Sequence, residues 1–218
     1  HRPDVVITPE GFLDGYLAAD PETTADDIRA AAIDSDDSVY TDVVGAWAGD
    51  QRSWVIFSCT RIVGRRGANT ALIFDRTGRL AGMYDKTHLQ SHDHKYATGH
   101  QLPVFASDFG TFGVLICADR RWPETVRTLA LKGARVLFNP TYGMMGDLNT
   151  AMMRTRAFES EVFIAFTHVR QSLVTGPGGC VLCDDCGDDD GISVTRIDLT
   201  EVDRTREGPA SHLQDRRP

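Results

Sequence analysis

The feature that most restricts the fold is an apolar run, Phe112–Ile116, which is followed directly by Cys117. A continuous apolar run of this length is typical of a strand that is buried on both faces. Further along the chain, Pro123 fits the first position of a helix, and Gly133 fits the position just past its end. A strand that is covered on both faces and followed by a helix predicts a layered α/β domain.

Strand-like and helix-like segments alternate along the chain, and no internal repeat or long linker interrupts them. Short apolar or β-branched runs predict strands at Val5–Thr8, Trp54–Cys59, Ala71–Phe74, Leu80–Tyr84, Phe112–Ile116, Arg135–Phe138, Glu161–Thr167, Val181–Cys183 and Ile192–Ile197. Periodicity and capping patterns predict helices over residues 24–32, with Asp27 as capping partner of Thr24, along a stripe of Val39, Val43, Val44 and Trp47, and over residues 147–160. We therefore predict one α/β domain over residues 1–203 and a polar arm or tail over residues 204–218.

Composition argues against several classes of function. Lys and Arg number 23 against 31 Asp and Glu, which gives a net charge of −8, whereas a protein that binds duplex nucleic acid usually carries a basic face. No apolar run approaches the roughly 20 residues that span a bilayer, and no signal peptide opens the chain. The five cysteines are an odd number in a chain too large to need disulfide staples. These features predict a cytoplasmic protein with free thiols and with neither nucleic acid nor a membrane as partner.

Three reactive side chains come just past predicted strands, where open α/β sheets build their active sites. Glu10 follows an apolar strand and a proline, where a partly desolvated carboxylate can serve as a general base. Lys86 ends a strand, and a buried ammonium there needs a carboxylate beside it or a developing anion to face. Cys117 ends the most hydrophobic strand, where backbone amides can favour a thiolate and hold an oxyanion.

Each of these residues also has an ordinary interpretation. Glu10 fits an exposed turn, Lys86 fits an exposed strand end, and Cys117 fits a packed core thiol. Together the three supply a base, a cation and a nucleophile, which suffice for acyl transfer through a thioester without a metal. Their sequence separations do not fix a geometry, so chemistry alone leaves both interpretations open.

Seven ordered motifs resemble the carbon–nitrogen hydrolase (nitrilase) superfamily: PEGFLDGY, YDKTHL, GVLICADRRWPE, FNPTYG, RTRAFESEVFIAF, SLVTGPGG and IDLTEVDRTR. The resemblance implies a four-layer α-β-β-α sandwich whose subunits pair into homodimers or larger homo-oligomers. It implies that Glu10 is the catalytic base, Lys86 the catalytic lysine and Cys117 the nucleophile. It also implies an oxyanion hole made by Lys86 and the backbone N–H of Ala118, with no metal or organic cofactor.

The sequence departs from the family pattern at three places. Members usually have a strand and a helix before the segment that begins here at Val5, so we expect a sandwich without that first strand and helix. Many members carry an additional Glu before a glycine that resembles Gly99. His92 and Asp93 lie near that place, and Asp93 is the better accessory acid. Members often have Asn at the position of His168, a change that the sequence does not explain.

The residues after the nucleophile narrow the substrate class. Nitrile-cleaving members typically follow the cysteine with Trp-Glu, whereas Ala118 and Asp119 stand here, so nitrile hydrolysis is disfavoured. The ADRRWPE stretch is similar to N-carbamoyl amino-acid amidohydrolases, in which arginines at the positions of Arg120 and Arg121 hold the substrate carboxylate. A guanidinium fork suits bidentate bonding to a carboxylate, although an arginine here could instead pair with a nearby acid and shape the turn.

Further residues are expected to line the substrate pocket. Asn139, Thr141 and Tyr142 follow the next predicted strand, and Tyr16 is a fourth candidate that could equally pack in the core. The expected ligand is a small amide or N-carbamoyl compound.

Two other clusters invite a metal interpretation. One contains His88, His92, Asp93, His94 and His100, but no Cys or Glu completes a recognisable ligand spacing. The other is the CxxCxxC of Cys180, Cys183 and Cys186, which lacks a fourth ligand. We therefore predict a polar loop, incidental thiols and no metal site.

Two functions of different classes remain open. One is a thiol amidohydrolase acting on small amides or N-carbamoyl compounds. The other is a catalytically idle binding or scaffold protein that kept the fold, and a true nitrilase is a weaker third option.

Overall fold

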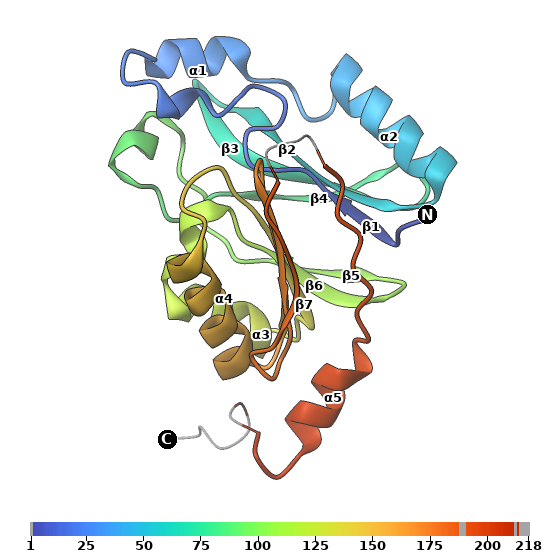
Figure 1. Cartoon of the computed structure of the whole chain (residues 1–218). Coiled ribbons are helices and arrows are strands. Elements are labelled where there is room, and N and C mark those ends of the chain that lie inside the picture. The colour runs from blue at the N-terminus through green and yellow to red at the C-terminus, as the bar shows by residue number, and fades with distance from the viewer. Residues whose placement is uncertain (1, 188–190, 212, 214–218) are drawn as a thin grey trace. The chain divides into compact units, whose positions relative to one another are not determined.

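The computed structural model describes residues 2–187, 191–211 and 213 (Figure 1). Its internal contacts divide the chain into two units, His1–Gln101 and Leu102–Pro218. Each unit has one β-sheet and its own helices. The α/β class predicted from the sequence is therefore confirmed.

The sheet of the first unit has the strand order β1-β2-β3-β4. β1 (Val5–Ile7) runs parallel to β2 (Trp54–Val63), and β2, β3 (Arg66–Phe74) and β4 (Leu80–Asp85) pair antiparallel in succession. The described residues of this unit also form the helical segments η1 (Leu17–Ala19), α1 (Ala25–Ala31), α2 (Val39–Gln51) and η2 (Ser91–Lys95). The predicted strands and helices of this half are all present.

Local sequence decides where α1 begins. Thr24 accepts a hydrogen bond from the backbone N–H of Asp27, and the Asp27 carboxylate accepts one from the N–H of Thr24. This reciprocal capping satisfies two amides that the first turn of a helix leaves unpaired. The capping box that the sequence predicted is confirmed.

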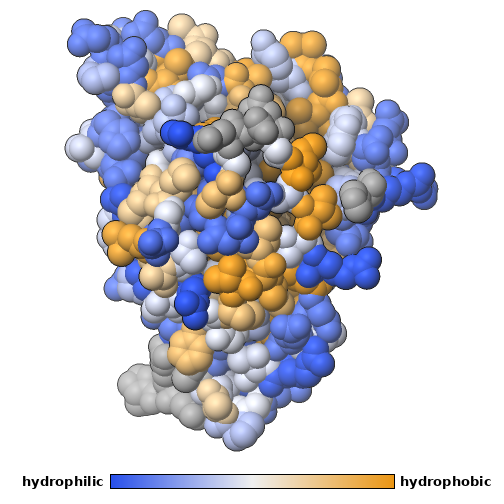
Figure 2. Space-filling model, in the orientation of Figure 1, coloured by the Kyte–Doolittle hydropathy of each residue, from blue (hydrophilic) through white to orange (hydrophobic). Residues whose placement is uncertain are grey.

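Helix α2 is present, but its large apolar residues face solvent. Val39, Val43 and Trp47 are 67%, 63% and 44% exposed, and apolar side chains are visible over the region of α2 in the upper part of Figure 2. The buried face of α2 instead carries small residues, among them Gly45. A Cβ on Gly45 would lie 2.7 Å from the carbonyl oxygen of Gly78 in the β3–β4 turn, so only a small residue fits there.

The sheet of the second unit has the order β10-β9-β8-β7-β6-β5. Its centre is parallel, with β6 (Gly110–Val114), β7 (Val136–Pro140) and β8 (Phe163–His168). Antiparallel neighbours flank this centre: β5 (Val104–Ser107) on one side, then β9 (Gln171–Thr175) and β10 (Val181–Asp185) on the other. β5 and β9 were not among the strands predicted from the sequence.

The predicted strand Ile192–Ile197 is wrong. Residues 191–198, all of them described, have no strand pairing. Ile192 is 92% exposed and Val194 is 56% exposed. Alternating apolar residues therefore do not make a strand here, because no neighbouring strand supplies the hydrogen bonds.

The helices of the second unit are η3 (Cys117–Arg121), α3 (Pro123–Leu131), α4 (Asp147–Ser160) and α5 (Thr200–Glu207). In Figure 1, α3 and α4 lie side by side against the sheet. The core between these helices and the sheet includes Leu115, Val126, Leu129, Leu137 and Ile164, all fully buried. The apolar run that was predicted to be buried on both faces is confirmed.

Helix α5 spans the boundary predicted at residue 203. Val202 is fully buried, and the Arg135 guanidinium contacts both carboxylate oxygens of Asp203 at 2.6 and 2.7 Å. Beyond this point, Arg206 donates to the carbonyl of Ala134 at 2.7 Å. Part of the predicted arm is thus bonded to the second unit.

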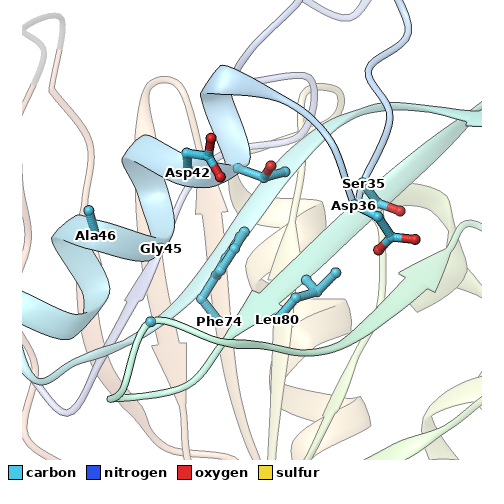
Figure 3. A pocket seen from close by; sticks show the side chains of 9 residues that line it. Ser35, Asp36, Asp42, Gly45, Ala46, Phe74 and Leu80 are labelled. Atoms are coloured by element: carbon cyan, nitrogen blue, oxygen red, sulfur yellow. The ribbon is translucent and has the colours of Figure 1, made fainter.

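A cavity of about 340 Å³ opens in the first unit between α2 and the β3–β4 hairpin (Figure 3). Its lining residues are Ser35, Asp36, Thr41, Asp42, Gly45, Ala46, Phe74, Gly78 and Leu80. None of the predicted site residues lines this cavity. In the described part of the chain, no helix combines the length and the apolar character that crossing a membrane requires.

Candidate active site

Glu10 lies in a tight loop directly after β1. Gly11 adopts φ +62°, and a Cβ there would lie 2.4 Å from the backbone nitrogen of Tyr16. The N–H of Gly15 donates to the carbonyl of Gly11 at 2.7 Å. Glycine at position 11 therefore lets the chain close on itself and brings Tyr16 back against the start of the loop.

Asp14 fixes this loop on β2. Its carboxylate accepts the Thr60 hydroxyl at 2.5 Å and the Thr60 backbone N–H at 3.1 Å. Burial raises the pKa of the Asp14 carboxyl above its usual value, and the two hydrogen bonds from Thr60 oppose that shift without cancelling it. The carboxylate thus serves as an anchor for the loop that carries Glu10.

Glu10 and Lys86 form a fully buried ion pair. Lys86 Nζ lies 3.0 Å from Glu10 Oε1, and both side chains are fully excluded from solvent. Asn69 Nδ2 donates to the same oxygen at 2.8 Å. Lys86 follows β4, and its backbone N–H donates to the carbonyl of Asn69 on β3. The sheet register therefore sets both contacts of Glu10 Oε1.

Asp93 is a second carboxylate on the same ammonium. Lys86 Nζ lies 2.6 Å from Asp93 Oδ2, closer than it lies to Glu10. Asp93 is fully buried in η2, while the neighbouring His92 side chain is 43% exposed. Lys86 Nζ also lies 5.5 Å from the centre of the Tyr16 ring. One lysine is therefore shared by two carboxylates, and all three side chains are fully buried.

Asn69 was not among the site residues predicted from the sequence. The available signal was the polar pair Asn69–Thr70 inside β3, which is otherwise buried and mostly apolar. A buried amide in such a strand needs hydrogen-bond partners, and one of them here is the carboxylate of Glu10.

Cys117 stands at a strained bend after β6. Its φ is +47°, in the left-handed region that residues with a Cβ rarely adopt, at a cost of about 1–3 kcal/mol. The Asp119 carboxylate accepts the N–H of Ile116 at 2.8 Å and so closes the turn. Cys117 is 4% exposed, and Ala118 follows it as the second residue of η3.

Arg120 holds this bend from inside the protein. It is fully buried and donates to the carbonyls of Cys117 at 2.6 Å and Met144 at 2.8 Å, and to Asn149 Oδ1 at 2.9 Å. Its guanidinium also lies 5.1 Å from the ring centre of Phe166. Arg120 is one of the two arginines predicted to hold a substrate carboxylate. Its guanidinium instead binds acceptors of the protein and stabilises the bend.

Arg121 is in a different environment. Its side chain is exposed, and its guanidinium contacts the sulfur of Met144 at 3.8 Å. Both backbone carbonyls of the pair are held by one side chain, because Arg156 donates to that of Arg120 at 3.1 Å and to that of Arg121 at 2.9 Å. The turn is thus fixed while the Arg121 guanidinium remains accessible.

The other predicted lining residues follow β7. Asn139 and Thr141 are fully buried, and Tyr142 is 38% exposed. Asn139 Nδ2 donates to the carbonyl of Leu115 at 3.1 Å, whereas its Oδ1 has no hydrogen-bond partner among the described residues. A buried acceptor of this kind normally has a donor, so a ligand could supply one.

The two clusters considered for metal binding give no site. Among residues 2–187, 191–211 and 213, no three His, Cys, Asp or Glu side chains are arranged to hold a metal ion. His88 Nδ1 instead pairs with the hydroxyl of Thr87, and the thiol of Cys183 contacts the carbonyl of Ser172. All five cysteines lie in the described part of the chain, and none forms a disulfide.

Comparison with known proteins identifies the family. The family model for carbon-nitrogen hydrolases matches residues 2–207, and this chain belongs to that family. It is 29% identical to 2-oxoglutaramate amidase of Bacillus subtilis, over 94% of this chain and 82% of that protein. It is 30% identical to a probable nitrilase of Schizosaccharomyces pombe, over 69% of this chain, and spans 60% of that relative's length.

Solved structures agree with this assignment at the level of fold. The carbon-nitrogen hydrolase of Helicobacter pylori G27 has a TM-score of 0.80 to this chain, with 20% identity, over 98% of this chain and 83% of that one. The likeness shows that the chain has the fold of the nitrilase superfamily, as the sequence motifs predicted.

Proposed function

We propose that this protein is a thiol amidohydrolase that cleaves the C–N bond of a small linear amide or N-carbamoyl compound through a thioester on Cys117. The observation that carries the proposal is the fully buried contact between Glu10 and Lys86. Burying two charges costs several kcal/mol per ion, so such a pair is a poor device for stability alone. Its place at the ends of strands, in a chain of this family, supports a role in chemistry.

The proposed reaction begins with the thiol. Glu10 takes the proton from Cys117, and the sulfur attacks the carbonyl carbon of the substrate. Lys86 Nζ and the backbone N–H of Ala118 stabilise the negative charge that develops on the carbonyl oxygen. Glu10 then gives its proton to the leaving nitrogen, the C–N bond breaks, and ammonia or an amine departs.

The second half of the proposed cycle returns the enzyme to its starting state. Glu10 takes a proton from a water molecule, whose oxygen attacks the thioester carbon. The C–S bond breaks, the acid product leaves, and Glu10 returns its proton to the sulfur of Cys117. The cycle needs no cofactor, and it requires Glu10 and Cys117 to act on the same bound substrate.

The environment of Cys117 supports its role as nucleophile. Cys117 has a left-handed backbone where a strand gives way to a helical turn, as the nucleophile of a strand-to-helix elbow does. Arg120 and Asp119 hold that bend by hydrogen bonds.

The substrate contacts can be narrowed. Arg120 donates its hydrogen bonds to acceptors within the protein. We therefore propose that Arg121 binds the carboxylate of an N-carbamoyl substrate. Asn139, Thr141 and Tyr142 line the proposed pocket. The buried Oδ1 of Asn139 is suited to accept an N–H from the amide or carbamoyl group.

The test is a screen for ammonia release over carbamoyl acids, aliphatic amides and nitriles. The proposal predicts turnover with members of the first or second class. Absence of turnover across all three classes, together with slow iodoacetamide labelling spread over all five thiols, would contradict it and favour an idle binding protein. Fast labelling at Cys117 alone supports the enzyme.

Assembly and location belong to the same proposal. We expect a homodimer or a larger homo-oligomer, which light scattering tests directly. A cytoplasmic location fits the five cysteines, none of which forms a disulfide.

A further inference from the structure

The carboxylate of Asp93 is held from two sides. On one side its Oδ2 accepts Lys86 Nζ at 2.6 Å and the backbone N–H of Gln90 at 3.3 Å. On the other side its Oδ1 accepts the hydroxyl of Tyr16 at 2.6 Å. A fully buried carboxylate that receives donors on both oxygens has a fixed orientation.

The Tyr16 hydroxyl has a second neighbour, His92. Its oxygen lies 2.9 Å from His92 Nε2. A phenol has one proton, and Tyr16 donates that proton to Asp93, so its oxygen must accept from His92. The neutral ring of His92 therefore carries its proton on Nε2. A continuous chain of hydrogen bonds follows, from half-exposed His92 through Tyr16, Asp93 and Lys86 to Glu10.

The buried charges in this hydrogen-bond network depend on the donor groups around Asp93. Glu10 and Asp93 share one ammonium. Lys86 Nζ lies 3.0 Å from Glu10 Oε1 and 2.6 Å from Asp93 Oδ2, so it is closer to Asp93. Donation from Tyr16 spreads the negative charge of Asp93 and limits its pull on the ammonium. If that donor were lost, Asp93 would rotate or draw Lys86 further from Glu10.

We propose that Tyr16 and His92 are positioning residues of this hydrolase. By fixing Oδ1 of Asp93, they hold Lys86 Nζ where it faces Glu10 and the developing oxyanion. The inference rests on the proposed function. Neither residue touches the substrate in this account, and each acts through Asp93.

The local fold maintains this arrangement before any substrate binds. Tyr16 itself adopts a left-handed backbone (φ 54°, ψ 63°), next to Gly15 at φ +78°. The Tyr16 and His92 rings meet edge to face with centres 6.0 Å apart. A strained backbone that points one hydroxyl at a buried carboxylate fits a functional constraint better than a packing role.

The test uses Tyr16→Phe, which removes the hydroxyl and keeps the ring. We expect kcat for hydrolysis of p-nitrophenyl acetate to fall at least roughly tenfold while KM changes less than about twofold, because Lys86 is misplaced for the transition state. Tyr84→Phe is the matched control. It removes the hydroxyl of another buried tyrosine, one that pairs with the hydroxyl of Thr87 at 3.0 Å, and should leave kcat unchanged.

His92 is tested by a pair of variants. His92→Leu removes the donor to Tyr16 and should lower kcat by about threefold. His92→Gln keeps a side-chain N–H and should restore most of that loss. Nitrogen NMR of the wild-type protein should find the neutral His92 ring protonated on Nε2.

The outcomes separate the two proposals. An inactive wild-type protein would overturn the proposed function and the inference with it. An active wild-type protein with Tyr16→Phe within twofold of its kcat, or with neutral His92 protonated on Nδ1, would overturn the inference alone.

Discussion

The two units of the chain position their reactive groups by different means. In the first unit, charged side chains hold one another, since Glu10, Lys86 and Asp93 are fully buried and joined by direct contacts. In the second unit, backbone conformation positions the reactive group. Cys117 lies in a strained bend, and its carbonyl accepts a hydrogen bond from Arg120. The proposed reaction should therefore be sensitive to single charges in the first unit and to turn geometry in the second.

Loss of the nucleophile should have the largest effect. Cys117→Ala should abolish turnover, because no thioester can form without the sulfur. Cys59→Ala and Cys183→Ala are the controls and should retain ammonia release. Burial raises the pKa of the Cys59 thiol to about 12, so that residue has almost no thiolate near neutral pH. Turnover that survives Cys117→Ala would remove the second unit from the chemistry.

The charged half of the site comes next. Glu10→Gln should be nearly as harmful as loss of the thiol, because it removes both the base and the proton donor. Lys86→Ala should lower kcat on the order of 10²–10³ if its main role is oxyanion stabilisation. The same change leaves two buried carboxylates without their cation, so unfolding in urea should show a loss of about 3–5 kcal/mol. A fully stable Lys86→Ala protein would contradict the account of the first unit.

The two arginines should separate turn geometry from substrate binding. Arg120→Lys cannot reach all its acceptors with one ammonium, so we expect a lower kcat and a stability loss of about 1–3 kcal/mol. Arg121→Ala should instead raise KM for a carbamoyl acid with little change in stability. Steady-state kinetics and urea unfolding measure both. A reversal of the two patterns would show that the bend depends on Arg121.

The smallest effect concerns the anchor of the Glu10 loop. The folded-state pKa of Asp14 is raised by burial, so the folded protein binds this proton more tightly than the unfolded chain does. Ionisation of Asp14 therefore lowers stability as the pH rises from the unfolded pKa through the folded one. In the Asp14→Asn variant, the side-chain amide can still accept from the Thr60 backbone N–H and donate to the Thr60 hydroxyl, but it cannot ionise. Relative to the wild type, this variant should gain stability in urea unfolding as the pH rises above the usual carboxyl pKa of about 4, and a relative loss would show that the charge itself is needed.

Local signals in the sequence were enough to predict several elements. The Thr24–Asp27 capping box, Pro123 at the start of α3 and the buried run at residues 112–116 each depend on neighbouring residues only. The face of α2 could not be predicted in this way, because a distant turn at Gly78 decides that only small residues fit beneath the helix.

The candidate site shows the same limit. Motifs selected Glu10, Lys86 and Cys117, and they favoured Asp93 over His92 as accessory acid. Asp93 Oδ2 lies 2.6 Å from Lys86 Nζ. The separate roles of Arg120 and Arg121 are invisible in the sequence, because identical side chains differ only in burial. Asn69 went unnoticed for a related reason, since its partner lies 59 positions away in the chain.

The most direct test of the central claim is to trap the thioester with p-nitrophenyl acetate. Its leaving group needs no proton, so at mildly alkaline pH the first step can proceed without Glu10, whereas hydrolysis of the thioester still needs a base for water. We predict that the Glu10→Gln protein accumulates one acetyl group, located on Cys117 by peptide mass spectrometry, while the wild type releases acetate and stays unmodified. Acetylation at another residue, or Glu10→Gln turnover as fast as the wild type, would contradict the proposed roles of Glu10 and Cys117 in one reaction.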